Sequence, residues 1–509
     1  MKNQTPAVSR TRSFTTVFLI EMWERFGYYG MAALLVLFMI DKIGFADEYA
    51  NLTWGAFTAL VFAAPSVGGW IGDKVLGTRR TMTIGAVVLA AGYLMLALPF
   101  DSLGFLYASL GVVVVGNGLF KSNAANLVRR IYEGDDAQID SAFTIYYMAV
   151  NIGSTASMLA TPWIKDHWGW HAAFAVCCSG MLLGLANFAL MHRTLAHIGS
   201  APDDQPIRWN HFAAVVAGGV ALAAATVFIL QHQTVARMCV WVAGLGILAI
   251  FGYMLTRCDR SERAGLVAAL ILTMQVILFF VFYQQMSTSL TLFALRNVDP
   301  AFSIGGVHLF TWSAAQFQAL NPIWIMFLSP VLAVLYARRA RRGRDIPVAG
   351  KYALGFVVVA IGFFVFGLSG RYAVEGRVSS WFMVAGYGLY SLGELLVSGL
   401  GLAMIARYVP ARMGGFMMGA YFVATGVSQY LGSLVANMAR MPSGDLDPLR
   451  SLPLYTHLFV WLGWLATGGA VVATLLLPLL SKLSRAHLDA VLASNDGKGA
   501  PLGTASASR

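Results

Sequence analysis

Charged residues are scarce in this sequence. Only 12% of its 509 residues are Asp, Glu, Lys or Arg, whereas 58% are apolar, and the mean hydropathy is +0.67. Soluble domains usually carry about 25% charged residues. The shortage excludes a soluble globular protein, and the apolar content excludes a disordered chain, which needs high charge and low hydrophobicity. One polytopic membrane bundle is the expected class.

Cysteine is also scarce, with four residues, none of them in a CxxC pair. Cys177 and Cys178 are neighbours inside an apolar run, so we expect free thiols rather than a disulfide framework or a metal site. The histidines are scattered, and the sequence contains no Ser/His/Asp set and no P-loop. These absences argue against an intramembrane enzyme and predict neither a metal nor another cofactor.

Fourteen apolar runs are each long enough to cross a bilayer core of about 30 Å as a helix, which takes roughly 20 residues. They lack a period of two and are too long for barrel strands. The runs cover approximately 14–40, 53–73, 80–99, 103–128, 141–163, 171–191, 211–230, 237–256, 264–295, 317–337, 351–370, 379–406, 412–438 and 454–481.

The net charge is +11, which could indicate a nucleic-acid partner. The positions of the basic residues indicate membrane topology instead. They lie in short gaps between the apolar runs. With a cytoplasmic N-terminus, 25 Lys and Arg fall on the cytoplasmic side and eight on the other, and only Arg25 and Lys121 fall within the membrane. The positive-inside rule therefore predicts that both termini are cytoplasmic.

Five ionisable residues lie deep within the runs: Glu21, Glu24, Arg25, Lys121 and Glu394. A charge at bilayer depth is costly and marks a functional site unless it serves an ion-pair network that merely joins helices. Three acids face two bases, so the uptake of one proton would neutralise the set. Both interpretations stay open at this point, and the functional one is favoured by three charges within five residues.

The first run places its polar residues on one helical stripe. Glu21, Glu24, Arg25, Tyr28 and Tyr29 follow the spacing i, i+3, i+4, i+7 and i+8. We expect two carboxylates, a guanidinium and two phenols to face a single cavity. The alternative for the tyrosines is an interfacial aromatic belt.

Two amides lie on other runs and have an ordinary alternative. Asn151 and Asn321 lie on the fifth and tenth runs. Each either lines the cavity or forms an interhelical hydrogen bond.

Three segments resemble known transporter signatures. Gly69–Arg80 (GWIGDKVLGTRR) resembles the loop between helices 2 and 3 of the major facilitator superfamily. Glu21–Tyr29 (EMWERFGYY) is similar to the ExxERFxYY motif of proton-coupled oligopeptide transporters, the POT or PTR family. Phe143–Ser154 (FTIYYMAVNIGS) resembles the second signature of that family, and Gln318–Pro322 and Gly393–Leu396 are similar to further family segments.

The resemblance implies an all-α major facilitator fold with 12 core transmembrane helices in two six-helix halves. Bacterial members insert two helices between the halves, which makes 14. The implied division is 1–192 for the N-terminal half, 193–263 for the linker with both inserted helices, 264–483 for the C-terminal half and 484–509 for a flexible cytoplasmic tail.

The resemblance also implies roles for individual residues, from carboxylate binding to proton coupling. Arg25 and Lys121 would bind a peptide carboxylate, and Glu394 would bind its amino group. The other implied substrate contacts are Tyr28, Tyr29, Asn151, Asn321, Tyr421 and Gln284; proton coupling is implied for Glu21, Glu24 and Glu394, and a cytoplasmic hinge for Asp73, Arg79 and Arg80.

The chain departs from the family pattern at the outer gate. Many members pair an arginine on helix 1 with an acid on helix 7, but here Ala32 and Gln284 occupy those places. Closure is therefore expected to depend on packing and neutral hydrogen bonds. Gln284 cannot titrate, so the coupled proton must bind elsewhere.

The expected function is a symporter that imports di- and tripeptides with protons by alternating access, in a bacterial inner membrane. Its partners would be peptides, protons and the lipid bilayer, with no nucleic acid, and the protein would be a monomer driven by the proton gradient. The alternative is a major-facilitator transporter of another charged solute, such as an amino acid derivative or an organic anion. A non-transporting peptide receptor is a third possibility.

Overall fold

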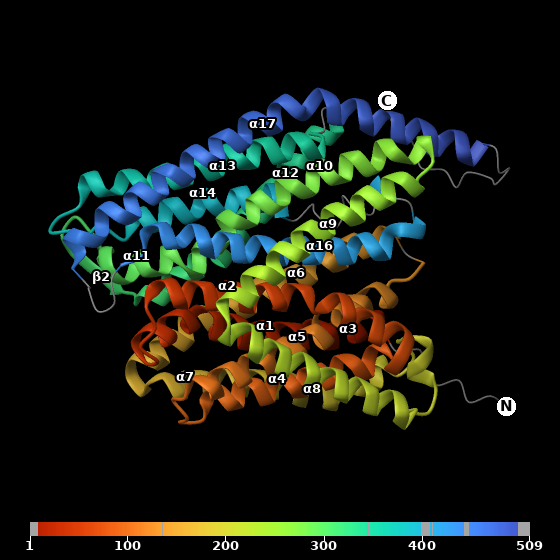
Figure 1. Cartoon of the computed structure of the whole chain (residues 1–509), viewed down its shortest axis with the longest axis horizontal. Coiled ribbons are helices and arrows are strands. Elements are labelled where there is room, and N and C mark those ends of the chain that lie inside the picture. Colours follow the sequence, from red (N-terminus) through yellow and green to blue (C-terminus); the bar gives the residue numbers. More distant parts are fainter. Residues whose placement is uncertain are drawn as a thin grey trace.

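The computed structural model describes residues 9–134, 136–343, 346–398, 408–409, 411–441 and 447–496. Long helices run side by side across the molecule, and both chain ends lie at the same end of the bundle (Figure 1). The second part of the expected run 379–406 and the last residues of the expected tail 484–509 lie outside the described residues.

The N-terminal half contains six spans. One of them is divided into α2, α3 and η1, because Pro65 starts a new helix directly after α2. The elements are α1 (Arg10–Asp41), α2 (Asp47–Ala63), α3 (Pro65–Ile71), η1 (Gly72–Leu76), α4 (Thr78–Ala97), α5 (Leu103–Ile131), α6 (Asp136–Trp168) and α7 (Trp170–Met191).

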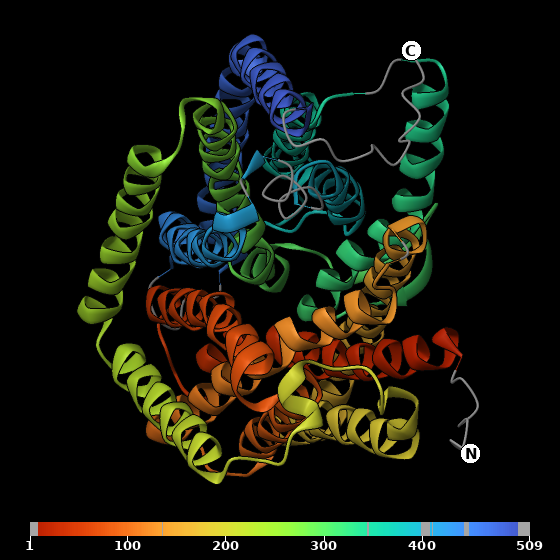
Figure 2. The ribbon, with the colours of Figure 1, turned by 90° about the vertical axis from the view of Figure 1, so that its right-hand side faces the viewer.

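The inserted helices lie at the periphery. After η2 (His192–Leu195) and η3 (Ala201–Asp204), α8 (Trp209–Gln231) packs on α5, and α9 (Gln233–Arg257) packs on α16 (Ala411–Ala436) of the other half. Both flank one side of the bundle when it is viewed from the end that carries the termini (Figure 2). Most of their side chains are exposed, as expected for helices that face lipid.

The C-terminal half has the same general plan with more irregular elements. These are α10 (Arg260–Tyr283), η4 (Gln284–Ser287), α11 (Ser289–Asn297), β1 (Ala301–Ile304), β2 (Val307–Thr311), η5 (Ala314–Ala319), α12 (Leu320–Arg341), α13 (Val348–Leu368), η6 (Ser369–Tyr372), α14 (Trp381–Val397), α16, η8 (Asn437–Ala439) and α17 (Pro448–Asp496).

Each of the fourteen expected runs coincides with helix in the part of the chain that the structure describes. Ten helices there are long and apolar enough to cross a membrane, and α14 is a shorter apolar helix. The chain is a multi-pass membrane protein, and the expected fold is confirmed. α1 is not among these ten, because Glu21, Glu24 and Arg25 lower its mean hydropathy.

Two local features differ from the expected uninterrupted helices. The run 264–295 breaks at η4, where Gln285 Nε2 donates to the carbonyls of Val281 and Gly432 at 3.0 and 2.9 Å. An antiparallel hairpin of β1 and β2 follows, although only helices were expected. Its signal in the sequence is Gly305–Gly306, because both glycines adopt the positive φ that a tight two-residue turn requires.

The two halves face each other across the centre of the bundle (Figure 2). The N-terminal half contributes α1, α2 and α6 to this boundary, and α2 packs on α16 while α6 packs on α12. Residues that are far apart in sequence therefore meet at mid-bundle, where the candidate site lies.

Candidate functional site

A cavity of about 160 Å³ lies between the two halves. Tyr29, Lys121 and Asn151 line it from the N-terminal half, and Asn321 and Glu394 line it from the C-terminal half. The structure thus brings together five residues that come from five different helices. A site between two halves with charged groups of both signs suits a small dipolar ligand.

A smaller cavity of about 50 Å³ adjoins the first and shares Tyr29, Lys121 and three other residues with it. Its further lining includes Arg25, Tyr28 and Gln284. The rings of Tyr28 and Tyr29 meet edge to face with centroids 5.4 Å apart. The tyrosines therefore face the central site, as the spacing predicted, and do not form an interfacial belt.

Arg25 and Lys121 form the cationic part of the site. Arg25 Nη2 is buried without a hydrogen-bond partner among the described residues, although Arg25 lines the smaller cavity. Lys121 Nζ lies 4.6 Å from the centroid of the Phe62 ring, and no ion pair joins it to the described residues. An unpaired buried donor such as Arg25 Nη2 is costly, and Lys121 is only partly buried in the lining of both cavities. The two cations thus make this side of the site positively charged.

Glu21 and Glu24 lie behind Arg25 rather than in the lining of either cavity. Arg25 Nε lies 3.3 Å from Glu21 Oε1 and also contacts Glu24 Oε2, and all three side chains are buried. The expectation that the whole stripe faces one cavity is wrong for these two acids. The stripe is wide enough that its far edge packs against the helices of its own half.

The opposite side of the larger cavity is acidic. Asn321 Nδ2 donates to Glu394 Oε2 at 2.7 Å and to Ser391 Oγ at 3.1 Å. Asn321 therefore forms an interhelical hydrogen bond and lines the cavity at the same time, so the two alternatives for it coincide. Asn151 lines the cavity as well, but its Nδ2 donates to the carbonyl of Tyr147 on its own helix at 2.8 Å.

Two tyrosines of the C-terminal half differ in their position relative to the two cavities. Tyr421 is buried on α16 but is not among the residues that line the two cavities, so its part in a side-chain pocket stays a prediction. Tyr283 lines both cavities and was not singled out from the sequence. It directly precedes Gln284 at the break in the seventh core helix, and such breaks are a useful signal for a binding site.

The end of the bundle opposite the termini is closed by contacts between the halves. Gln284 Nε2, beside the smaller cavity, donates to Thr58 Oγ1 at 3.3 Å and to Ser433 Oγ at 3.0 Å. Neutral hydrogen bonds therefore occur at the position of the missing gate pair, and closure by them stays a prediction. A buried ion pair also joins Arg296 on α11 to Asp47 on α2, with Nη1 2.6 Å from Oδ2. The predicted run 264–295 ends one residue before Arg296, whereas α11 continues through it.

Comparison with known proteins decides the family. The POT family pattern matches residues 79–451, which is most of the chain. The chain belongs to the POT family.

The relatives of this POT protein include peptide permeases and peptide transporters. It is 42% identical to dipeptide and tripeptide permease A of Salmonella typhimurium strain LT2, with 97% of each chain covered. It is 41% identical to the permease of the same name from Escherichia coli strain K12, with 95% of each covered. Its fold matches the crystal structure of tetrameric PepTSo2 at 57% identity and a TM-score of 0.86, covering 94% of this chain and 100% of the other. A peptide transporter POT in complex with sulfate matches at 27% identity and a TM-score of 0.80, with 93% of this chain and 95% of the other covered.

The three expected hinge residues of this POT member, Asp73, Arg79 and Arg80, have separate partners. Asp73 Oδ1 accepts from Asn126 Nδ2 at 2.6 Å and pairs with Arg130 Nη2 at 3.1 Å, both on α5. Among the described residues no hydrogen bond or ion pair joins it to Arg79 or Arg80. Asp73 therefore connects η1, which follows α3, to α5 through a hydrogen bond and an ion pair.

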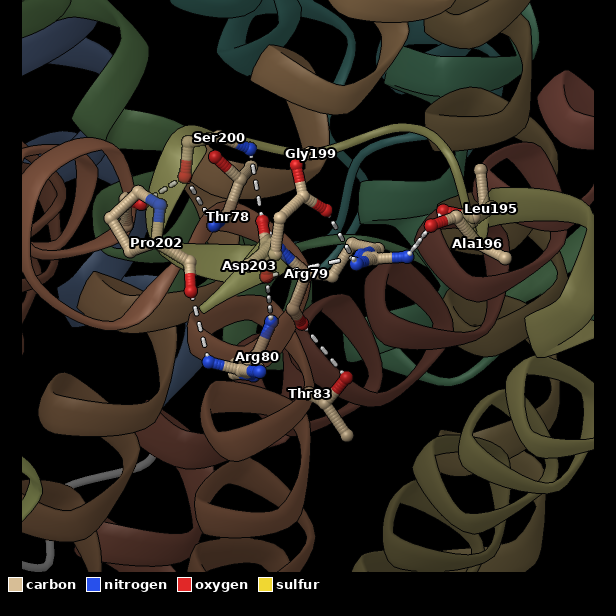
Figure 3. Close-up of polar contacts among 12 residues, drawn as sticks. Thr78, Arg79, Arg80, Thr83, Leu195, Ala196, Gly199, Ser200, Pro202 and Asp203 are labelled. Carbon is tan, nitrogen blue, oxygen red and sulfur yellow. Dashed lines mark hydrogen bonds and ion pairs between the residues drawn. The ribbon is translucent and has the colours of Figure 1, made fainter. Parts of the chain in front are cut away.

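Arg79 and Arg80 instead bind the segment that leads to the inserted helices (Figure 3). Arg79 Nη1 donates to the carbonyls of Leu195 and Ala196 at 2.7 and 2.6 Å, and Arg80 Nη1 donates to that of Pro202 at 3.0 Å. The Asp203 carboxylate accepts from the backbone N–H groups of Arg79 and Arg80 at 3.2 and 3.3 Å. It thereby caps the first turn of α4, whose N–H groups have no partner within the helix.

Proposed function

We propose that this protein is a symporter that imports di- and tripeptides together with protons. The main support is the site between the halves, which has Arg25 and Lys121 at one side and the carboxylate of Glu394 at the other. A peptide at neutral pH is a zwitterion and needs both. The names of the relatives, which are dipeptide and tripeptide permeases, support the same substrate class.

The peptide carboxylate would bind Arg25 and Lys121, whose donors have room for it. The peptide ammonium would bind Glu394, which Asn321 holds in place at 2.7 Å. Tyr28 and Tyr29 would contact the backbone or side chains. Rocking of the two halves around the site would expose it to each side in turn.

Proton coupling rests on the buried charges. Three acids and two bases leave one negative charge if all are ionised, and a proton on Glu21, Glu24 or Glu394 would remove it. A proton that enters down a potential of 100 mV supplies about 2.3 kcal/mol, enough for accumulation. No cofactor is needed for this cycle.

We further propose that the protein lies in the bacterial cytoplasmic membrane with both termini inside, because 25 basic residues then face the cytoplasm against eight outside. The end closed by Arg296 and Asp47 would be the outer one. A monomer was expected, but the protein with 57% identity is a tetramer, so we propose a tetramer here as well. Light scattering of the purified protein in mild detergent measures this.

Uptake of radiolabelled dialanine into proteoliposomes tests the function. We expect accumulation under an inward proton gradient and none after an ionophore collapses both the gradient and the membrane potential. N-acetyl-dialanine, which lacks the ammonium, should compete poorly. If Glu394→Gln still accumulates a purely anionic substrate and dialanine is not transported, the protein moves another charged solute instead.

A further inference from the structure

A long apolar groove opens on the lipid-facing side of the N-terminal half. It has a volume of about 710 Å³ and lies between α3, α5 and the inserted helix α8. Small residues make it wide, since Gly68 and Gly118 let α3 and α5 touch at its floor, and Gly218 of α8 faces open space. No residue that lines this groove also lines either central cavity.

One end of the groove is strongly basic. A second, polar pocket of about 150 Å³ adjoins it and shares Lys74 and His211 with it, and Arg80 and Arg208 also line this pocket. Among the described residues no acidic side chain lines either pocket, and no ion pair or side-chain hydrogen bond engages Lys74, Arg208 or His211. Three basic groups are therefore left without a counter-charge where the chain leaves the membrane.

The dimensions match one leaflet of a bilayer. From His211 at the basic end to Leu222 at the apolar end, α8 rises about 16 Å at 1.5 Å per residue. The hydrocarbon of one leaflet is half of a core of about 30 Å. Trp70 in the groove and Trp209 at the start of α8 are both exposed, as residues at the depth of lipid headgroups often are.

We infer that this groove binds one anionic phospholipid. Its phosphate and headgroup occupy the basic pocket of Lys74, Arg80, Arg208 and His211, and an acyl chain lies along α8 against α3 and α5. Basic pockets between transmembrane helices on the cytoplasmic side are suited to such headgroups. In this proposal the inserted helix α8 forms the outer wall of a lipid-binding site, beside the connection between α3 and α4.

Charge favours a lipid over a second copy of the chain. A copy would have to bring carboxylates to neutralise Lys74, Arg208 and His211 and also a long apolar ridge to fill the groove. An anionic phospholipid carries both parts in one molecule and is always present in the membrane. The basic pocket and the groove are also continuous, which a free phosphate would not require.

Native mass spectrometry of the purified protein with phosphatidylglycerol or phosphatidylcholine of identical acyl chains tests this. We expect one phosphatidylglycerol to bind more tightly than phosphatidylcholine. Lys74→Ala with Arg208→Ala should weaken that binding by about 30-fold, because two charges at the headgroup are lost. The matched control is Arg339→Ala with Lys482→Ala, which removes two exposed charges near the same end of the other half and should have no effect.

The apolar part is tested separately. Gly218→Leu adds an apolar side chain to the lining of the groove, at a position where an added Cβ meets no atom within 4 Å. It should abolish the tight phosphatidylglycerol site. Gly244→Leu on α9 is the control, because a Cβ added there also meets nothing within 4 Å and lies outside the groove.

Three results would overturn the inference. Equal loss of lipid in both charge variants would mean ordinary annular lipid. Displacement of phosphatidylglycerol by free glycerol phosphate would mean a phosphate site that needs no acyl chain. A change in the number of protomers with Gly218→Leu, without a change in lipid affinity, would make the groove an interface between copies.

Discussion

Arg296 and Asp47 form a two-pronged ion pair that joins the two halves of the molecule. Arg296 Nη1 lies 2.6 Å from Asp47 Oδ2, and Nη2 lies 2.8 Å from Oδ1. Nη1 also donates to the Tyr455 hydroxyl at 2.7 Å, and the backbone N–H of Met441 donates to Asp47 Oδ2 at 3.1 Å. Both side chains are almost fully buried, so the pair has no water to replace a lost partner.

The first prediction concerns this pair. Arg296→Leu leaves the Asp47 carboxylate buried and unpaired, which should destabilise the closed outer end by about 3–5 kcal/mol. A cysteine at Ser287, which lines the smaller cavity, then reports opening. We expect a membrane-impermeant maleimide added outside to label Ser287→Cys about 100-fold faster or more in the Arg296→Leu background.

Arg440 and Glu48 provide the matched control. They also join the two halves at this end, 3.0 Å apart, but their side chains are 57% and 46% exposed. Exposed pairs contribute about 0–1 kcal/mol, so Arg440→Leu should leave labelling nearly unchanged. Equal effects of the two arginine substitutions would show that the buried pair is not what holds the outer end closed.

The second prediction concerns the cationic side of the cavity. Removal of one partner of a buried charged contact usually costs about 2–5 kcal/mol, which is roughly 30-fold or more in affinity. Lys121→Ala and Arg25→Ala should each abolish concentrative dipeptide uptake in proteoliposomes. Lys42→Ala is the control, since Lys42 forms an exposed pair with Asp101 at 3.0 Å. Near-normal transport by either cavity variant would remove that residue from the site.

The third prediction assigns the coupled proton. Arg25 Nε contacts both Glu21 and Glu24. Glu21 lies four residues before Arg25, where side chains on a helix meet most readily, so we assign Glu21 to the ion pair and the coupled proton to Glu24. One arginine cannot fully offset two neighbouring acids, so one of them must still bind the proton readily. Glu24→Gln should lose proton-driven accumulation but keep peptide counterflow, which needs binding without net proton movement. Accumulation against a gradient by Glu24→Gln would transfer the assignment to Glu21 or Glu394.

The fourth prediction concerns the contact between α4 and the segment after α7. Asp203 is buried and caps the first turn of α4, so Asp203→Ala should lower the free energy of unfolding by about 1–2 kcal/mol. Its neighbour Asp204 is 78% exposed and lies 3.9 Å from Arg79. Asp204→Ala should therefore change the stability by less than about 0.5 kcal/mol. Thermal unfolding of both variants in the same detergent measures the difference.

Hydropathy and charge along the chain were enough to locate the fourteen spans and the five ionisable residues within them. Each span carries its own signal, because a helix in lipid must satisfy its backbone internally and present apolar side chains outward. The motif around Arg25 likewise identified the family from adjacent residues. These features are local, so they can be seen in the order of the residues alone.

Only the folded chain decides which distant groups meet. Asp47 and Arg296 look like unremarkable residues near the ends of two spans, and Asp73 appears closer in sequence to Arg79 than to Arg130. Packing of the helices gives Asp47 its buried partner and turns Asp73 toward α5, while Arg79 binds a segment over 100 residues away. Such pairings depend on how the helices are rotated and tilted against one another, and no single helix carries that information.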